Sequence, residues 1–146
     1  ATLPALLALL AAACGPGSDA GPATRRIVSL HDTTTEIVVG LGRAADLVAV
    51  TEPEFLSEGA RGQVAGVSRL PQGRVSIESL LLHGPDLVLG TDVVLELQAD
   101  LDRALDARGV ARTWIDPHGL DGLMGTIDQI GVLIGNTPAQ RAYEGV

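Results

Sequence analysis

Several side chains that could bind a ligand or a metal follow directly after an apolar run. The stretch RRIVSLHDTTTEIVVGLG, residues 25–42, places His31, Asp32 and three threonines after the run at 27–30. An imidazole, a carboxylate and hydroxyls can contact a small molecule, hold a metal ion or cap the helix pattern that follows. For His31, ligand contact and an ordinary position at a sheet edge both remain open. Thr33 and Glu36 have the spacing of a capping box, which predicts Thr33 as the helix N-cap.

The same arrangement recurs after four further apolar runs, where Glu54 and Asp116 also occur. His31, His118 and the acidic residues near them could in principle hold a zinc or manganese ion, because imidazole and carboxylate groups suit these metals. The candidate ligand-binding residues are His31, Asp32, Thr34, Thr51, Glu52, Ser68, Arg69, Thr91, Asp92 and His118.

The elements that must position these residues alternate between strand and helix patterns. Buried strands are predicted at residues 27–30, 47–50, 86–90 and 112–115, with a weaker one at 64–67. Helices are predicted after Thr33, at 76–84, along a stripe at Leu97, Leu101 and Leu105, and at 123–134. Continuous apolar strands separated by helices indicate a parallel sheet covered on both faces. The prediction is a three-layer, Rossmann-like α/β unit whose ligand residues gather at the carboxyl ends of the strands.

Composition and motifs argue against nucleic-acid binding and catalysis. The net charge is -8 and all ten basic residues are arginine, so no basic stripe is available for a phosphate backbone. The GLGRAA segment at 40–45 matches a dinucleotide fingerprint, but it precedes a strand instead of opening a helix. Neither a P-loop nor a nucleophile elbow occurs. We therefore predict a protein that is not an enzyme, with no catalytic residues and no intrinsic cofactor.

The first residues are typical of an exported protein. Residues 3–14, LPALLALLAAAC, form an apolar run of signal-peptide length that ends at the only cysteine. AAAC is similar to a bacterial lipobox and predicts lipidation of Cys14, so the lipid anchor would be the only membrane contact. The expected organisation is a partial lipoprotein signal peptide at 1–13, a flexible tether at 14–24, a ligand-binding lobe at 25–137 and a truncated helix at 138–146. The expected location is extracytoplasmic and membrane-anchored.

Four ordered stretches resemble the helical-backbone substrate-binding proteins of ABC importers for cobalamin, haem and ferric siderophores. They are residues 25–42, LVAVTE at 47–52, VSIESLLLHGPDLVLGT at 75–91 and residues 105–135. Thr35, Glu36 and Ile37 fit the family pattern, whereas His31 occupies the place of a small residue. The resemblance implies two Rossmann-like lobes joined by a long helix. The chain would be the N-terminal lobe with the start of that helix at Pro138, and the second lobe would be missing.

The resemblance also implies a ligand and a partner. An iron complex or tetrapyrrole (ferric siderophore, haem or cobalamin) would be captured and delivered to an ABC permease dimer with its ATPase subunits, and Glu78 falls at the permease-docking position. Aromatic residues, which often line haem and corrin pockets, are only 2% of the chain. If haem or a metal ion is the ligand, His31 is the first candidate for a metal ligand and His118 is the second. Arg69 and Arg74 could instead face an anionic siderophore. The alternatives are a Zn or Mn ion-binding protein of similar architecture and, less favoured, a fragment of a nucleotide-using α/β enzyme.

Overall fold

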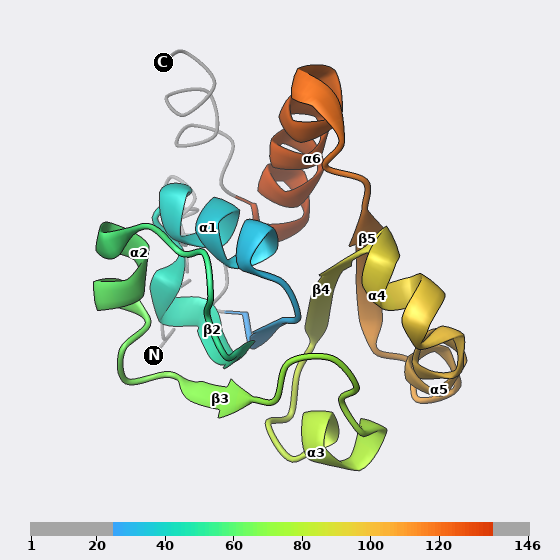
Figure 1. The fold of residues 1–146 in the computed structure, drawn as a ribbon. Coiled ribbons are helices and arrows are strands. Elements are labelled where there is room, and N and C mark those ends of the chain that lie inside the picture. The colour runs from blue at the N-terminus through green and yellow to red at the C-terminus, as the bar shows by residue number, and fades with distance from the viewer. Residues whose placement is uncertain (1–24, 136–146) are drawn as a thin grey trace, which may run out of the picture.

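The described part of the protein contains a five-stranded parallel sheet. The computed structural model describes residues 25–135, so the predictions for the signal peptide, Cys14, the tether and the helix from Pro138 lie outside it. The strand order is β3-β2-β1-β4-β5, and each neighbouring pair is parallel (Figure 1). The strands are β1 (Ile27–Ser29), β2 (Leu47–Thr51), β3 (Ser68–Leu70), β4 (Leu87–Thr91) and β5 (Ala111–Ile115).

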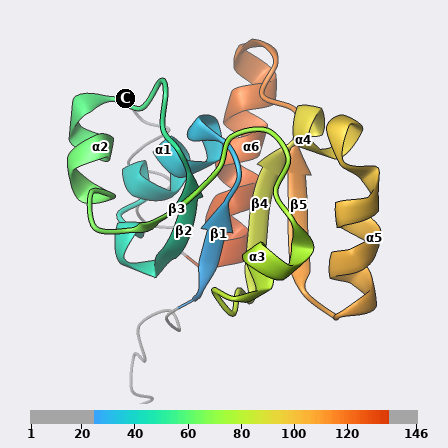
Figure 2. The ribbon, with the colours of Figure 1, turned by 60° about the horizontal axis from the view of Figure 1, so that its bottom comes forward.

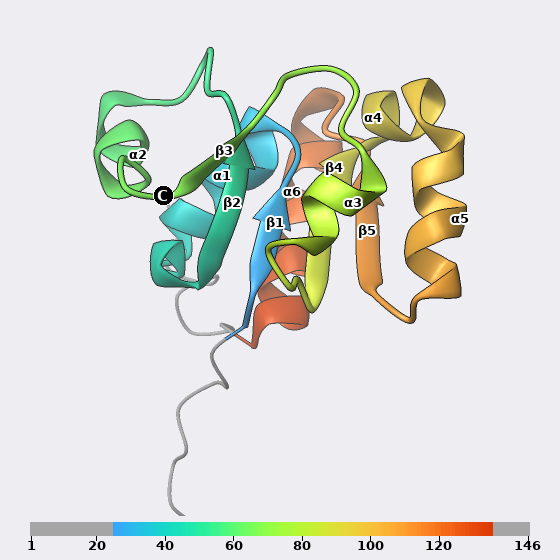
Figure 3. The same cartoon turned by 90° about the horizontal axis from the view of Figure 1, so that it is seen from below.

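Helices cover both faces of this sheet, as the sequence predicts. In Figure 3, α3 lies in front of the sheet, whereas α1 and α6 lie behind it. Figure 2 shows the same layers and places α4 beyond the tips of β4 and β5. The helices are α1 (Asp32–Gly40), α2 (Glu58–Gln63), α3 (Ile77–Leu81), α4 (Asp92–Leu97), α5 (Ala99–Ala107) and α6 (Gly119–Ile134), with a 3₁₀ turn, η1 (Ala44–Asp46), before β2. The three-layer α/β prediction is confirmed.

Successive residues along a strand pack alternately into two hydrophobic cores, one on each face of the sheet, which explains why the strand sequences are mostly apolar. Ile27 and Leu87 point to the core shared with α1, α2 and α6, which also contains Ile130. Val28 and Val88 point to the opposite core, which also holds apolar residues of α3 and α5. Strands β1, β2 and β4 are buried on both faces, so most of their positions are apolar, whereas β3 and β5 at the sheet edges are partly exposed.

The predicted strand at 64–67 is wrong. Val64 is the C-cap of α2, its N–H bonds the carbonyl of Ala60, and its side chain is fully buried. Strand β3 begins only at Ser68. The short α2, EGARGQ, was not predicted because two glycines obscure its helical pattern; Ser57 caps it through a bond from the N–H of Ala60.

Two helix boundaries also differ from prediction. The Leu97, Leu101 and Leu105 stripe is divided between α4 and α5, because Gln98 leaves helical geometry (φ -140°, ψ 56°). The buried Gln98 side chain bonds both the N–H and the carbonyl of Val75, at 3.0 and 2.9 Å. Leu97 is consequently 63% exposed while the other two leucines are buried. At α1, the N-cap is His31 and not Thr33.

Candidate functional site: a cleft at the reversal of strand order

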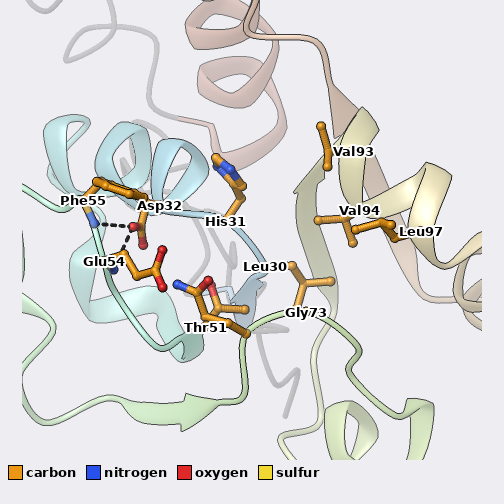
Figure 4. Close-up of a pocket in the computed structure, with 11 residues that line it drawn as sticks. Leu30, His31, Asp32, Thr51, Glu54, Phe55, Gly73, Val93, Val94 and Leu97 are labelled. Atoms are coloured by element: carbon orange, nitrogen blue, oxygen red, sulfur yellow. Dashed lines mark hydrogen bonds between the residues drawn. The ribbon is translucent and has the colours of Figure 1, made fainter.

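A cavity lies where the strand order reverses, at the carboxyl ends of β1 and β4. In open parallel sheets, this reversal leaves a crevice between the segments that follow the two strands. The cavity has a volume of about 260 Å³ and opens between the β1–α1 junction and α4 (Figure 4). Its lining residues are Leu30, His31, Asp32, Thr51, Glu54, Phe55, Gln72, Gly73, Val93, Val94 and Leu97.

His31 caps helix α1 from the side of this cavity. Its backbone is extended (φ -155°, ψ 147°), and its Nδ1 accepts a hydrogen bond from the N–H of Thr33 at 3.1 Å. A neutral imidazole has one acceptor nitrogen, so this bond leaves the proton on Nε2. In this arrangement the free edge of the ring is a hydrogen-bond donor. Coordination of a metal through Nε2 would require the cap to be released.

Asp32 and Glu36 hold the loop between β2 and α2 against α1. Asp32 Oδ2 accepts hydrogen bonds from the N–H groups of Glu54 and Phe55, at 3.0 and 2.7 Å. The two carboxylate oxygens of Glu36 accept bonds from the backbone N–H and the hydroxyl of Ser57. These two acids therefore position the loop that carries Phe55, whose side chain is 85% exposed beside the cavity.

Thr34, predicted as a ligand contact, lies in the core instead. It is fully buried, and its hydroxyl is 2.6 Å from that of Ser29 and 2.8 Å from the carbonyl of His31. Thr35 bonds the same Ser29 hydroxyl at 2.8 Å. The hydroxyls of Ser29, Thr34 and Thr35 bond one another and the carbonyl of His31 beneath the first turn of α1. Thr34 is not among the residues that line the cavity.

Ser68 and Arg69 also lie away from the cleft. They occupy the first two positions of β3 and not the segment after it, because the strand begins later than predicted. Arg69 donates to the carbonyl of Val64 at 3.0 Å. The residues that actually follow β3 and reach the cavity are Gln72 and Gly73.

The remaining predicted residues gather near the carboxyl edge. Thr51 lines the cavity and is 6% exposed, while the side chain of the neighbouring Glu52 is exposed. Thr91 ends β4, is 1% exposed, and its hydroxyl has no hydrogen-bond partner. It precedes Asp92, whose Oδ1 accepts the N–H of Val93 at 2.9 Å.

Asp92, Asp116 and His118 form a cluster with the geometry of possible metal ligands. One ligand atom from each lies within 4.8 Å of the others. The ring of His118 bonds the carboxylate of Asp116, which raises the pKa of His118, and the charges of Asp116 and Asp92 raise it further. The backbone N–H and then the ring of His118 lower the pKa of Asp116. His31 is not a member of this cluster.

Sequence reasoning missed the apolar side of the cavity. Phe55, Val93, Val94 and Leu97 line it, yet each falls in a segment that looked like a loop or a buried stripe. One available signal was Phe55, a lone aromatic four residues beyond a strand. Residues 93 and 97, one helical turn apart, expose 48% and 63% of their side chains.

Glu78 and Arg74 face a different groove. Glu78 is exposed in the first turn of α3, and with Arg74, Gln98, Asp100 and Leu101 it lines a hollow of about 430 Å³ between α3 and α5. Arg74 makes a loose ion pair with Asp100 at 3.9 Å. Neither Arg74 nor Arg69 is among the residues that line the cleft, so the suggestion that they face an anionic ligand is not supported.

Known proteins share this arrangement of strands and helices. No protein-family model and no curated protein sequence matches the chain. Among solved structures, the periplasmic haem-binding protein HutB of Vibrio cholerae is 25% identical and matches with a TM-score of 0.70 over 84% of this chain and 46% of its own. A possible iron-binding, periplasmic solute-binding protein of Staphylococcus epidermidis is 21% identical and matches with a TM-score of 0.71 over 82% of this chain and 46% of its own. The periplasmic vitamin B12-binding protein BtuF of V. cholerae is 22% identical and matches with a TM-score of 0.61 over 85% of this chain and 48% of its own.

The chain has the fold of one lobe of a periplasmic solute-binding protein. It spans less than half the length of the structures that it matches. Among the residues that the structure describes, none of the helices is long and apolar enough to cross a membrane.

Proposed function

We propose that this chain is the N-terminal lobe of an extracytoplasmic solute-binding protein of an ABC importer. The complete protein captures a metal complex or tetrapyrrole (ferric siderophore, haem or cobalamin) between two lobes and delivers it to the permease and its ATPase subunits. The lobe binds its cargo without chemical change. The named neighbours, which bind haem, iron or vitamin B12, support this ligand class.

The observation that carries the proposal is the cavity at the strand-order reversal. Its wall combines the exposed apolar side chains of Phe55, Val93 and Leu97 with the imidazole of His31. Apolar surface with a few placed polar groups is the usual composition of a small-molecule site, and such sites are commonly completed at a domain interface.

Binding assays on the complete two-lobed protein test this proposal. Titration with haem, cyanocobalamin and ferric siderophores of several chemical types should identify at least one tight, stoichiometric ligand. Residues 25–146 alone should bind the same ligand much more weakly, because they supply one wall of the site. Absence of binding to every metal complex in the panel, or equally tight binding by the isolated lobe, would overturn the proposal.

The anchor and location form a separate part of the proposal. The periplasmic neighbours support an extracytoplasmic location, and the AAAC segment supports a lipid on Cys14. Cys14→Ser should release the mature protein from the membrane fraction into the soluble extracytoplasmic fraction. A variant that remains membrane-bound would contradict lipidation while leaving the ligand assays unaffected.

The Asp92, Asp116 and His118 cluster favours a second candidate, capture of a bare Zn²⁺ or Mn²⁺ ion. An imidazole with two carboxylates is a suitable donor set for either metal, and three protein ligands leave room for a fourth from a second lobe. Metal analysis of the purified complete protein, with His118→Ala as the comparison, separates the two candidates. Stoichiometric Zn or Mn that is lost in His118→Ala, together with no binding of metal complexes, would favour the ion.

A further inference from the structure

We propose that the cleft selects a metal complex that is neutral or positively charged and excludes strongly anionic complexes. This inference rests on the proposed function, since it names the charge class of the same ligand. It follows from the charges at the cavity, from the positions of the arginines and from the polarity of the free edge of His31.

The ionised groups around the cavity are carboxylates. Glu54 and Asp32 line it, and Figure 4 shows the Glu54 carboxylate extending into the hollow toward Thr51. Asp32 is engaged by two backbone N–H groups, whereas the Glu54 side chain is exposed. The exposed acid Glu52 follows the carboxyl end of β2. Asp116, which follows β5, is paired with the ring of His118 and adds less to the negative potential. A ligand in the cleft therefore meets a negative potential from this lobe.

No arginine lines the cleft among residues 25–135, and the chain has no lysine to take that role. Most arginines bind groups elsewhere on the lobe. Arg26 donates to the carbonyls of His83 and Gly84, Arg69 to that of Val64, and Arg112 pairs with Asp102 and Asp106. Arg61 donates a 3.4 Å bond to the backbone carbonyl of the lining residue Glu54, but it is not itself among the lining residues.

An anionic complex would therefore meet repulsion that this wall does not compensate. Closure of a second lobe removes water and lowers the local dielectric constant, which strengthens both repulsion and attraction. The exposed side chains of Phe55, Val93 and Leu97 suit the apolar surface of a ligand. The Nε2–H of His31 suits a hydrogen-bond acceptor such as a hydroxamate or amide oxygen. A ferric hydroxamate with a free ammonium group, or a corrin with amide side chains, meets these requirements; a tris-catecholate or a dicarboxylate porphyrin does not.

A matched set of ligands tests the charge class directly. The complete protein is titrated with one linear ferric trihydroxamate in three forms: a free terminal ammonium, the acetylated neutral amine and the succinylated anionic amine. Haem and cyanocobalamin are titrated in parallel. If the ligand is a hydroxamate complex, affinity should fall in the order cationic, neutral, anionic. If the ligand is a tetrapyrrole, cyanocobalamin should bind and haem should not.

Glu54→Gln locates the effect in this lobe. It should weaken the cationic form about two- to fivefold, the range of an exposed charge pair, and should change the affinity of the neutral form less than that of the cationic form. Glu58→Gln, an exposed acid on α2 outside the cleft, should change neither. If the anionic form binds more tightly than the cationic form, or haem more tightly than cyanocobalamin, this inference is overturned while the proposed function stands. If no complex binds at all, the proposed function fails as well.

Discussion

The N–H of Thr33 donates a hydrogen bond to Nδ1 of His31, 3.1 Å away, at the mouth of the cleft. The side chain that the sequence marks as a candidate metal ligand therefore serves as the cap of α1. The cap fixes the tautomer of the ring, so the Nε2 of this cavity-lining residue carries an N–H and not a lone pair. Two variants separate the capping role of His31 from a ligand role.

His31→Ala should lower the free energy of unfolding by about 0.5–2 kcal/mol, because a helix cap is lost. His31→Asn keeps a side-chain acceptor at the cap, so its stability should stay close to that of the wild type. If the complete protein binds haem, the absorption spectrum of the His31→Asn complex should match that of the wild type. A changed Soret band in His31→Asn would show that His31 gives up the cap and coordinates iron.

Asp32→Ala should loosen the loop between β2 and α2. The N–H groups of Glu54 and Phe55 lose their acceptor, so their hydrogen exchange should become faster, and ligand affinity should fall because Phe55 is no longer held beside the cavity. One oxygen accepts both bonds, so Asp32→Asn should retain most of the protection. Equal exchange in all three proteins would contradict the anchoring role of Asp32.

Gly90→Ala should destabilise the lobe by about 1–3 kcal/mol. A Cβ at position 90 would lie 2.6 Å from the Cζ3 atom of Trp114, so the indole ring has to move. Gly59→Ala is the matched control: its Cβ meets no atom within 4 Å, and in helix α2 it should be neutral or slightly stabilising. Chemical unfolding of the three proteins measures both effects. An unchanged midpoint for Gly90→Ala would show that Trp114 repacks without cost.

Asp102 should contribute a stability that is lost in acid. Hydrogen bonds from Arg112 and then from Trp114 lower the pKa of Asp102 below its value in the unfolded chain. A lowered pKa stabilises the folded state above the unfolded-chain pKa of about 3.9, and the contribution disappears as the pH falls through the folded-state value. Urea unfolding between pH 7 and about pH 3 should show a smaller loss of stability for Asp102→Asn than for the wild type. Parallel pH profiles would exclude this contribution.

Glu78→Arg in the complete protein should reduce transport while ligand affinity stays near that of the wild type. Glu78 is exposed on α3 and lines a groove separate from the cleft, so a charge reversal there leaves the ligand site intact. Glu58→Arg is the control, because Glu58 is also an exposed acid in the first turn of a short helix. If both variants lose transport equally, or if Glu78→Arg loses ligand binding, Glu78 is not a docking residue.

The layered fold could be predicted from the sequence because burial on both faces leaves a strong local signal. The runs at 27–30, 47–50 and 86–90 are mostly apolar, with Ser29 and Asp86 as exceptions, and polar residues follow where each strand reaches the edge. The same signal predicts His31, Asp32 and Thr51 at the carboxyl edge of the sheet, and all three line the cavity there. It failed at β3, an edge strand of three residues, where Val64 and Val67 form a stronger apolar pair than the strand itself.

Only the tertiary structure decided which of these edge residues share a site and what each side chain does there. The strand order brings the β1–α1 junction beside α4, although about 60 residues separate them, and no local pattern records that pairing. The same holds for the cap at His31, the loop bonds of Asp32 and the bond of Arg69 to the carbonyl of Val64. Each depends on a backbone group that comes within hydrogen-bond distance of the side chain only after the chain has folded. Residue type and spacing determine what a side chain is able to do, whereas its bonded partners determine what it does.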